Sequence, residues 1–273
     1  MGIVAISRQV AALGDEIAAV AAKKLGYTFV SRTELEARIV RLGFPADRLI
    51  KYDEKKPSFF SSLAKERDDY LQYLQTAVLE AANEGNCILI GRGACVILEE
   101  VPNLVSLRFV AKDSIRLQRL AKEFTWTEKQ AQQRISESDS NRGGFNKSFF
   151  GIDINDATHF HLVMNTGIIN ADEGGTIIAN LVDTLITPER DSIGREKIKT
   201  MLAAQQLVNK LIFEHKVAVE FLHAVINDKT ILLRGIAESS AIVEHTLELT
   251  QKTMPGYVVQ SAISIVQDFK MYQ

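Results

Sequence analysis

The sequence predicts an α/β protein with a parallel sheet covered by helices on both faces, followed by a small α-β-β-α-β domain. Three observations support this fold class. Short apolar segments alternate with longer helical segments as far as Leu185. These apolar segments lack the period-two alternation of half-exposed strands, which is typical of strands buried on both faces. The chain has 273 residues, of which 46% are hydrophobic, so one large core or two unequal cores can form.

Local patterns justify the elements of the first part. The apolar run 3–6 predicts a buried strand. Gly14, Asp15 and Glu16 then begin a helix, because acidic residues stabilise a first turn, and Gly26 ends it. A polar segment interrupted by Pro57 comes next, and one helix separates it from the third strand. The expected strands are 3–6, 27–30, 87–91, 104–110 and 160–165, and the expected helices are 14–25, 32–43, 67–84, 112–124, 127–142 and 171–185.

The second part begins after a change in composition. The segment Thr187 to Gly194 is interpreted as a linker, which places the domains at 1–187 and 192–273. Two apolar runs around Asn227-Asp228 predict a hairpin. The expected elements are a helix at 195–213, strands at 217–226 and 230–237, a helix at 239–253 and a strand at 257–267.

Composition excludes several classes of protein. The formal net charge of −2 gives no support for a nucleic-acid binder. Two cysteines are too few for a disulfide framework, and His159 with His161 lacks a third metal ligand, so no metal site is predicted. No apolar run approaches the ~18 residues of a transmembrane segment. Because no signal peptide precedes the first strand, a cytoplasmic location is expected.

The carboxyl ends of the strands mark the expected ligand site. In open parallel sheets, ligands bind outside these ends. Here the ends carry Ser7-Arg8, Gly91-Arg92 and Asn165-Thr166. Arginine suits an anionic ligand because its planar fork can bind a phosphate at two points.

Four features now occur in a defined order. They are the strand-loop-helix of 2–27, the segment "CILIGRGACVILEEVPNLVSLRFVAKDSIRLQRL" (87–120), "RISESDSNR" (134–142), and "HLVMNTG" before the closing helix. In this order the chain resembles the cytidylate kinase-like family of P-loop nucleoside monophosphate kinases, over about residues 1–186. The resemblance implies a three-layer P-loop kinase-like fold, a nucleotide partner, and ATP with Mg²⁺ as cofactors if the protein is active. CMP or a related nucleotide would be the acceptor.

The resemblance also implies roles for individual residues. Arg92 would contact the acceptor phosphate, and Arg116 and Arg119 would bind substrate, one of them reaching the donor phosphates. Arg134, Asp139 and Arg142 match the catalytic lid, where two guanidiniums would neutralise the charge that spreads during transfer. The nucleotide-binding loop and the helix start that follows it would contribute Ser7, Arg8, Gln9, Gly14, Asp15 and Glu16.

The loop departs from the family pattern. A working loop of the family looks like "SRxxGSGGRE", whereas this chain has "SRQVAALGDE", with Asp15 at the basic position. Removing one preorganised donor costs about 3 kcal/mol in a transition state, and a carboxylate facing a phosphate adds repulsion. Arg8 and the helix N-terminus can still attract an anion. Two interpretations therefore stay open: a weak CMP kinase, or an inactive kinase-like protein that regulates other molecules.

The tail resembles a BON-type domain over about residues 192–268. The hairpin "INDKTILLRGIAES" with Gly235 and the segment "MPGYVVQSAISIV" with Gly256 carry this resemblance. It implies an interaction module with a protein or lipid partner, and a scaffold role is a third interpretation. A homo-oligomer is compatible with the same pattern.

Overall fold

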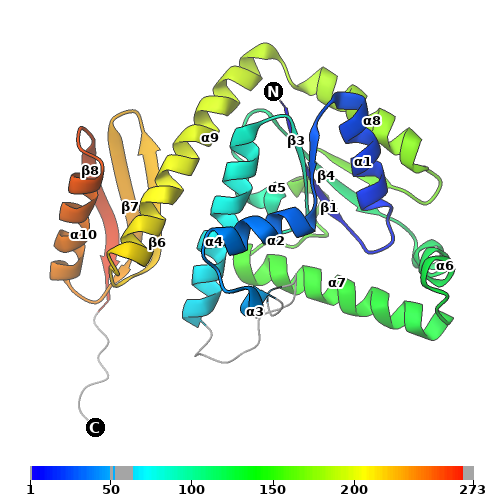
Figure 1. The fold of residues 1–273 in the computed structure, drawn as a ribbon, viewed down its shortest axis with the longest axis horizontal. Coiled ribbons are helices and arrows are strands. Elements are labelled where there is room, and N and C mark those ends of the chain that lie inside the picture. The colour runs from blue at the N-terminus through cyan, green and yellow to red at the C-terminus, as the bar shows by residue number, and fades with distance from the viewer. Residues whose placement is uncertain (1, 50–51, 53–63, 267–273) are drawn as a thin grey trace, which may run out of the picture. The chain divides into compact units, whose positions relative to one another are not determined.

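The structure is a computed structural model that describes residues 2–49, 52 and 64–266. The polar segment around Pro57 lies outside the described residues. The chain forms two compact units, with the boundary between Arg195 and Glu196. Each unit has its own sheet and its own apolar core, so each is described by itself (Figure 1).

The first unit is built on a parallel sheet of five strands. They are β1 (Ile3–Arg8), β2 (Thr28–Val30), β3 (Cys87–Ile90), β4 (Leu104–Val110) and β5 (Leu162–Asn165), in the order β2-β3-β1-β4-β5. Every neighbouring pair runs parallel. The predicted fold class is thus confirmed. Because β1 lies in the centre, its carboxyl end has β3 on one side and β4 on the other, and Ser7 pairs in register with Arg108.

Helices cover both faces of this sheet. Figure 1 shows α1 (Gly14–Leu25) beside α8 (Ala171–Leu185) on one face, and α4 (Ala64–Glu84) with α5 (Ala94–Ile97) on the other. The glycines of α8 explain how close α1 and α8 approach: a Cβ added to Gly175 would lie 2.4 Å from Cγ1 of Val20. The remaining helices are α2 (Arg32–Arg41), α3 (Ala46–Leu49), α6 (Asp113–Phe124), α7 (Glu128–Phe150) and a 3₁₀ turn at Ala157–His159.

Helix α7 is longer than the sequence predicts. The prediction ended it at Arg142, yet the helix continues through Gly143 and Gly144 to Phe150 and ends at Gly151, which has φ 72°. Phe145 is almost fully buried, and its ring centroid lies 4.8 Å from that of Phe149. This packing offsets the roughly 1 kcal/mol that each glycine costs inside a helix.

The second unit contains the predicted order of elements. After α9 (Pro188–Asn209) and a π-helical turn (Lys210–Glu214) come β6 (Val219–Asn227), β7 (Thr230–Ala237), α10 (Ser240–Thr253) and β8 (Val258–Ile265). The sheet order is β6-β7-β8, with β6 antiparallel and β8 parallel to β7. Its core contains Leu211, Leu222, Ile231 and Leu233. The BON-type resemblance itself stays a prediction.

The predicted linker, Thr187 to Gly194, is helical, because helix α9 begins inside it at Pro188. Thr187 caps this helix by accepting a hydrogen bond from the backbone N–H of Arg190 at 3.2 Å. Proline at the first helical position and the acidic residues Glu189 and Asp191 in the first turn also favour a helix start. These signals for a helix start were therefore present in the sequence, but the segment was interpreted as a linker because the composition changes there.

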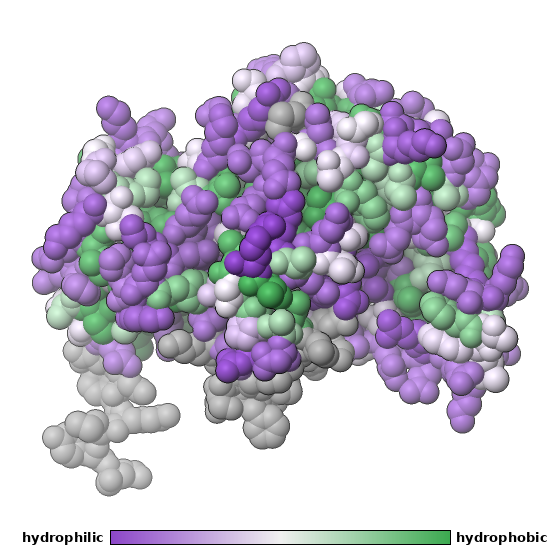
Figure 2. Space-filling model, in the orientation of Figure 1, coloured by the Kyte–Doolittle hydropathy of each residue, from purple (hydrophilic) through white to green (hydrophobic). Residues whose placement is uncertain are grey.

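The surface carries both hydrophilic and apolar residues. On the face drawn in Figure 2, hydrophilic residues predominate and apolar residues show between them. Within the described residues, no helix is long and apolar enough to cross a membrane.

Candidate functional site

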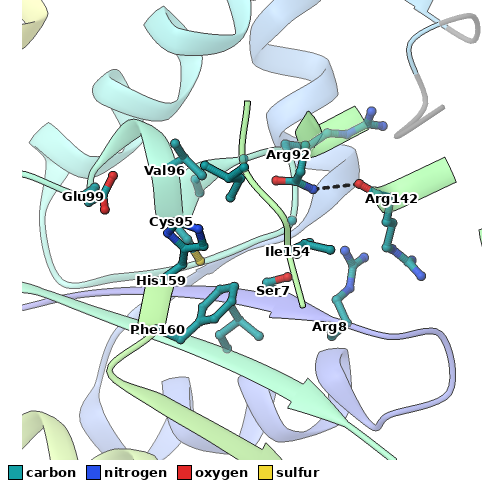
Figure 3. A pocket seen from close by; sticks show the side chains of 16 residues that line it. Ser7, Arg8, Arg92, Cys95, Val96, Glu99, Arg142, Ile154, His159 and Phe160 are labelled. Atoms are coloured by element: carbon teal, nitrogen blue, oxygen red, sulfur yellow. Dashed lines mark hydrogen bonds between the residues drawn. The ribbon is translucent and has the colours of Figure 1, made fainter. Parts of the chain in front are cut away.

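A pocket opens at the carboxyl ends of β1 and β3 (Figure 3). Its floor is the end of β1, and its walls come from the turn after β3, the second half of α7 and the segment before β5. This is the place where a parallel sheet is expected to bind a ligand. The lining residues are Ile6, Ser7, Arg8, Gly91, Arg92, Gly93, Ala94, Cys95, Val96, Glu99, Arg142, Asn146, Ile152, Ile154, His159 and Phe160.

The pocket has two chemically different ends. Figure 3 shows Arg8 from β1 and Arg142 from α7 on one side, with Cys95, His159 and Phe160 on the other. Cationic groups therefore gather at one end, while the opposite end holds the ring of Phe160 together with His159, Cys95 and the carboxylate of Glu99. Such a pocket suits a molecule with an anionic group at one end and a flat or apolar part at the other.

Arg92 is held by groups of the protein itself. Its side chain is fully buried, its backbone φ is 56°, and its Nη1 donates to the carbonyl oxygen of Tyr52 at 2.7 Å. Its Nη2 forms an ion pair with Glu36 of α2. The residue thus lines the pocket while its charge is already paired, and its contact with an acceptor phosphate stays a prediction.

The loop between β1 and α1 has an unusual backbone for its sequence. Ala11 and Leu13 both have positive φ, at 58° and 57°. Such conformations favour glycine and cost an alanine or leucine about 1 kcal/mol or more. Gln9 fixes the start of the loop, because its N–H donates to the carbonyl of Phe109 at 3.0 Å and its Oε1 accepts from the N–H of Ala111 at 3.1 Å.

Arg8 and Gly14 pack directly against each other. Arg8 is 8% exposed, and a Cβ on Gly14 would lie 2.6 Å from Cγ of Arg8. Glycine is therefore required at position 14 for the arginine stem to cross the start of α1. Asp15 and Glu16 are exposed in the first turn of this helix, where acids are favourable.

Arg119 of α6 holds the loop from the other side. Its Nη1 donates to the carbonyl of Ala11 at 2.9 Å and to Oγ1 of Thr166 at 3.2 Å. Burial lowers the pKa of this guanidinium, while Glu16 acts in the opposite direction. The observed role of Arg119 is to connect the loop to the end of β5.

The predicted lid residues fall into three environments. Arg142 lines the pocket and donates to Oγ of Ser138. Asp139 accepts from Nη1 of Arg116 at 2.9 Å, so it pairs across to α6. Arg116 is buried and also bonds Asp113 at 2.6 Å. Arg134 is exposed on α7.

Arg108 is a site residue that sequence reasoning missed. It lies on β4, is 5% exposed, and donates from Nη1 to Oγ of Ser7 at 2.9 Å. Its Nη2 donates to Oδ1 of Asn155 at 3.1 Å, and its Cζ lies 5.9 Å from the ring centroid of Phe160. Burial lowers its pKa, Asp139 acts in the opposite direction, and the nearby Arg142 lowers it further. The sequence feature that could have identified Arg108 is its position as a charged residue inside the otherwise apolar strand "LVSLRFV".

The other titratable residues have structural environments. His161 Nδ1 accepts from the N–H of Ser106 at 3.0 Å, and burial lowers its pKa. Burial raises the pKa of Cys87 and of Cys95 to about 12, so both stay thiols at neutral pH. Among the described residues, no cluster of three or more histidine, cysteine, aspartate or glutamate side chains could hold a metal ion.

Known proteins resemble this chain over the first unit. A sequence profile of the cytidylate kinase-like family matches residues 3–168. A cytidylate kinase from Methanopyrus kandleri is 30% identical over 138 residues, which cover 48% of this chain and 72% of that protein. The crystal structure of an uncharacterized protein from Eubacterium ventriosum has a TM-score of 0.54 at 20% identity, covering 67% of this chain and 98% of that chain. A shikimate kinase from Bacteroides thetaiotaomicron has a TM-score of 0.43 at 12% identity, with the same coverage of 67% and 98%.

Proposed function

Because the chain belongs to the cytidylate kinase-like family, we propose that it binds a nucleoside monophosphate such as CMP in the arginine-lined pocket, with slow transfer of phosphate from ATP. The observation that carries the binding part is the polarity of the pocket. Arg8 and Arg142 lie at one end, and His159 with Phe160 lies at the other. A nucleotide has the same polarity, since its phosphate is anionic and its base is a flat ring that aromatic side chains can contact.

The sequence of the loop between β1 and α1 is the reason why we expect phosphate transfer to be slow. A Walker loop uses a lysine for the outer phosphates and a hydroxyl for Mg²⁺, and neither residue stands at the matching positions here. Leu13 caps α1 without a side-chain hydrogen bond, and Asp15 follows in the first turn. The residues present therefore fit a triphosphate with Mg²⁺ poorly. In this proposal Arg8 and Arg119 are the cations nearest the loop, and Arg134, Asp139 and Arg142 keep their lid roles only as an expectation.

Calorimetric titration tests the binding part. CMP should bind, whereas cytidine, which lacks the phosphate, should bind at least about tenfold more weakly, because a charged hydrogen-bond partner is worth about 1.5–3 kcal/mol. Arg142→Met should lower the affinity for CMP and leave the affinity for cytidine unchanged. Equal affinities for CMP and cytidine would contradict a phosphate-binding role of the arginines.

A coupled assay with ATP and CMP tests the kinetic part. The expected turnover number is below about 1 s⁻¹, the low edge of ordinary enzyme rates. Faster turnover would show that the altered loop still supports efficient transfer. Binding of CMP without any turnover would favour the regulatory interpretation.

A second candidate function is self-association through the tail, and one observation favours it. Strand β8 lies at the edge of its sheet, and its eight residues carry no charge. Uncharged edge strands invite pairing with another chain, and two copies would meet without like-charge repulsion. The opposite edge, β6, carries Glu220 and an irregular register between Glu220 and His223. The BON-type resemblance of this unit also favours an interaction role.

Light scattering of the full chain over a range of concentrations tests this second candidate. The measured mass should rise toward that of a dimer. Ala262→Lys, at an exposed position of β8, should abolish the rise, and Lys252→Ala on α10 should not. A monomer at every concentration would contradict self-association and leave a different protein, or a lipid, as the partner to be tested.

A further inference from the structure

Arg108 is a buried cation whose contacts are all neutral. It is 5% exposed on β4, next to the central strand β1, and its partners are the hydroxyl of Ser7, the amide oxygen of Asn155 and the ring of Phe160. Across the part of the chain that the structure describes, no carboxylate lies within ion-pair distance of this guanidinium. Burial without a counter-charge is costly, because the desolvation of a guanidinium is then not repaid.

Two other buried arginines of the same unit are paired with acids. Arg92 has Glu36, and Arg116 has both Asp113 and Asp139. These two guanidiniums therefore have a carboxylate partner within the protein, whereas the hydrogen-bond partners of Arg108 are neutral. Arg108 lies instead beside the arginine end of the pocket. Burial lowers the pKa of its guanidinium, the carboxylates of Asp139 and Asp153 act in the opposite direction without forming an ion pair with it, and Arg142 lowers it further.

The hydrogen bond to Ser7 restricts what that hydroxyl can do. Ser7 Oγ accepts from Nη1 of Arg108 at 2.9 Å, so its single O–H is available for a different acceptor. Ser7 lines the pocket together with Arg8 and Arg142. An acceptor placed in the pocket near Ser7 would therefore receive a hydrogen bond from the hydroxyl and lie close to three guanidiniums.

We propose that Arg108 is the built-in counter-charge of a phosphate monoester bound in this pocket, and that it positions the Ser7 hydroxyl to donate to a phosphate oxygen. Arg108 is a positioning residue in this arrangement, because it acts through Ser7 and through its charge. The inference rests on the pocket of the proposed function, but it requires only the phosphate group and not the nucleoside.

Thermal unfolding with and without inorganic phosphate provides the test. The wild-type protein should unfold at a higher temperature when phosphate is added, because a ligand of the native state stabilises it. Arg108→Met should unfold at the same or a higher temperature than the wild type in phosphate-free buffer, since it removes an unpaired buried charge. The same variant should lose the phosphate-dependent increase. Arg41→Met, which removes an exposed arginine of α2, should leave both temperatures unchanged.

Two further variants keep the test decisive if Arg108→Met does not fold. Arg108→Lys should retain part of the phosphate-dependent increase, because the charge remains. Ser7→Ala should lower the affinity of the protein for inorganic phosphate about tenfold, which is the loss expected for one charge-assisted hydrogen bond. A structural role alone would lower the unfolding temperature of Arg108→Met in phosphate-free buffer and preserve the increase.

Three results would overturn the inference. They are an intact phosphate response in Arg108→Met, an unchanged phosphate affinity in Ser7→Ala, and a wild-type protein that does not respond to phosphate. A phosphate response that depends on Arg108, in a protein that does not bind CMP, would support this inference and refute the nucleoside part of the proposed function. Binding of CMP that does not depend on Arg108 would do the reverse.

Discussion

The guanidinium of Arg119 donates a hydrogen bond to the carbonyl oxygen of Ala11, with 2.9 Å between the two atoms. This contact joins α6 to the loop that precedes α1, and the same side chain reaches Thr166 at the end of β5. Ala11 has φ 58°, a conformation that alanine rarely adopts without support. Arg119 therefore stabilises a loop backbone that the local sequence does not favour.

Arg119→Met is expected to destabilise the protein by about 2 kcal/mol, because charge-assisted hydrogen bonds to backbone carbonyls are lost. Urea unfolding measures this change. Hydrogen exchange should also become faster at the loop amides of residues 9–14, while the amides of β3 keep their protection. Wild-type exchange in the loop would show that Arg119 is not what holds it.

Glu36→Gln should destabilise the protein by about 3 kcal/mol, because it removes a carboxylate that pairs with the fully buried Arg92. The matched control is Glu84→Gln, since Glu84 forms an exposed ion pair with Arg38 of the same helix α2. That pair should contribute less than about 1 kcal/mol. Urea unfolding of both variants provides the comparison. Equal losses would mean that burial of Arg92 does not set the strength of its pair.

Asp15→Arg should raise the affinity for ATP about fivefold, because it reverses an exposed charge at the start of α1 and is worth about 1 kcal/mol of Coulomb energy. Titration calorimetry at low ionic strength measures the gain, which added salt should reduce. The control is Glu189→Arg, which reverses a charge in the first turn of α9 and should leave the affinity for ATP unchanged. If the affinity for ATP does not change in Asp15→Arg, Asp15 does not face a bound phosphate.

Asp191 should make stability depend on pH in the acidic range. Its hydrogen bond to Arg195 lowers the pKa of Asp191 to about 2 in the folded chain, below its ordinary value of 3.8. A lowered folded pKa means that the stabilisation is complete above about pH 5 and is lost as the pH falls from about 4 to 2. The difference in unfolding free energy between the wild type and Asp191→Asn should shrink over the same range. Arg195→Met should flatten this pH dependence, and a constant difference would refute the assignment.

Most elements could be predicted because their signals are local. The strand 104–110 and the helix 171–185 match β4 and α8, since apolar runs, capping residues and helical periodicity act over a few neighbouring positions. The errors arose where local and distant forces disagree. Gly143 and Gly144 favour the end of a helix, but the burial of Phe145 keeps α7 intact.

The candidate site was predictable only in part. The strand ends pointed to Ser7, Arg8 and Arg92, and all three line the pocket. The partner of each arginine could not be predicted, because Glu36 lies 56 positions before Arg92 in the sequence. Arg108 was missed for the same reason, because only the register of β1 and β4 places it beside Ser7 at the candidate site.

The residues alone determined the alternation of strands and helices, the family to which the first unit belongs, and the composition of the loop segment 7–16, which has one glycine and no lysine. These properties depend on residue type and short spacing, which a single chain displays directly. Tertiary structure decided which arginines are neutralised and which face the pocket. Glu36 neutralises Arg92 and Asp139 neutralises Arg116, while Arg108 keeps a net charge, because only folding brings a carboxylate within a few ångströms of a guanidinium or leaves it out.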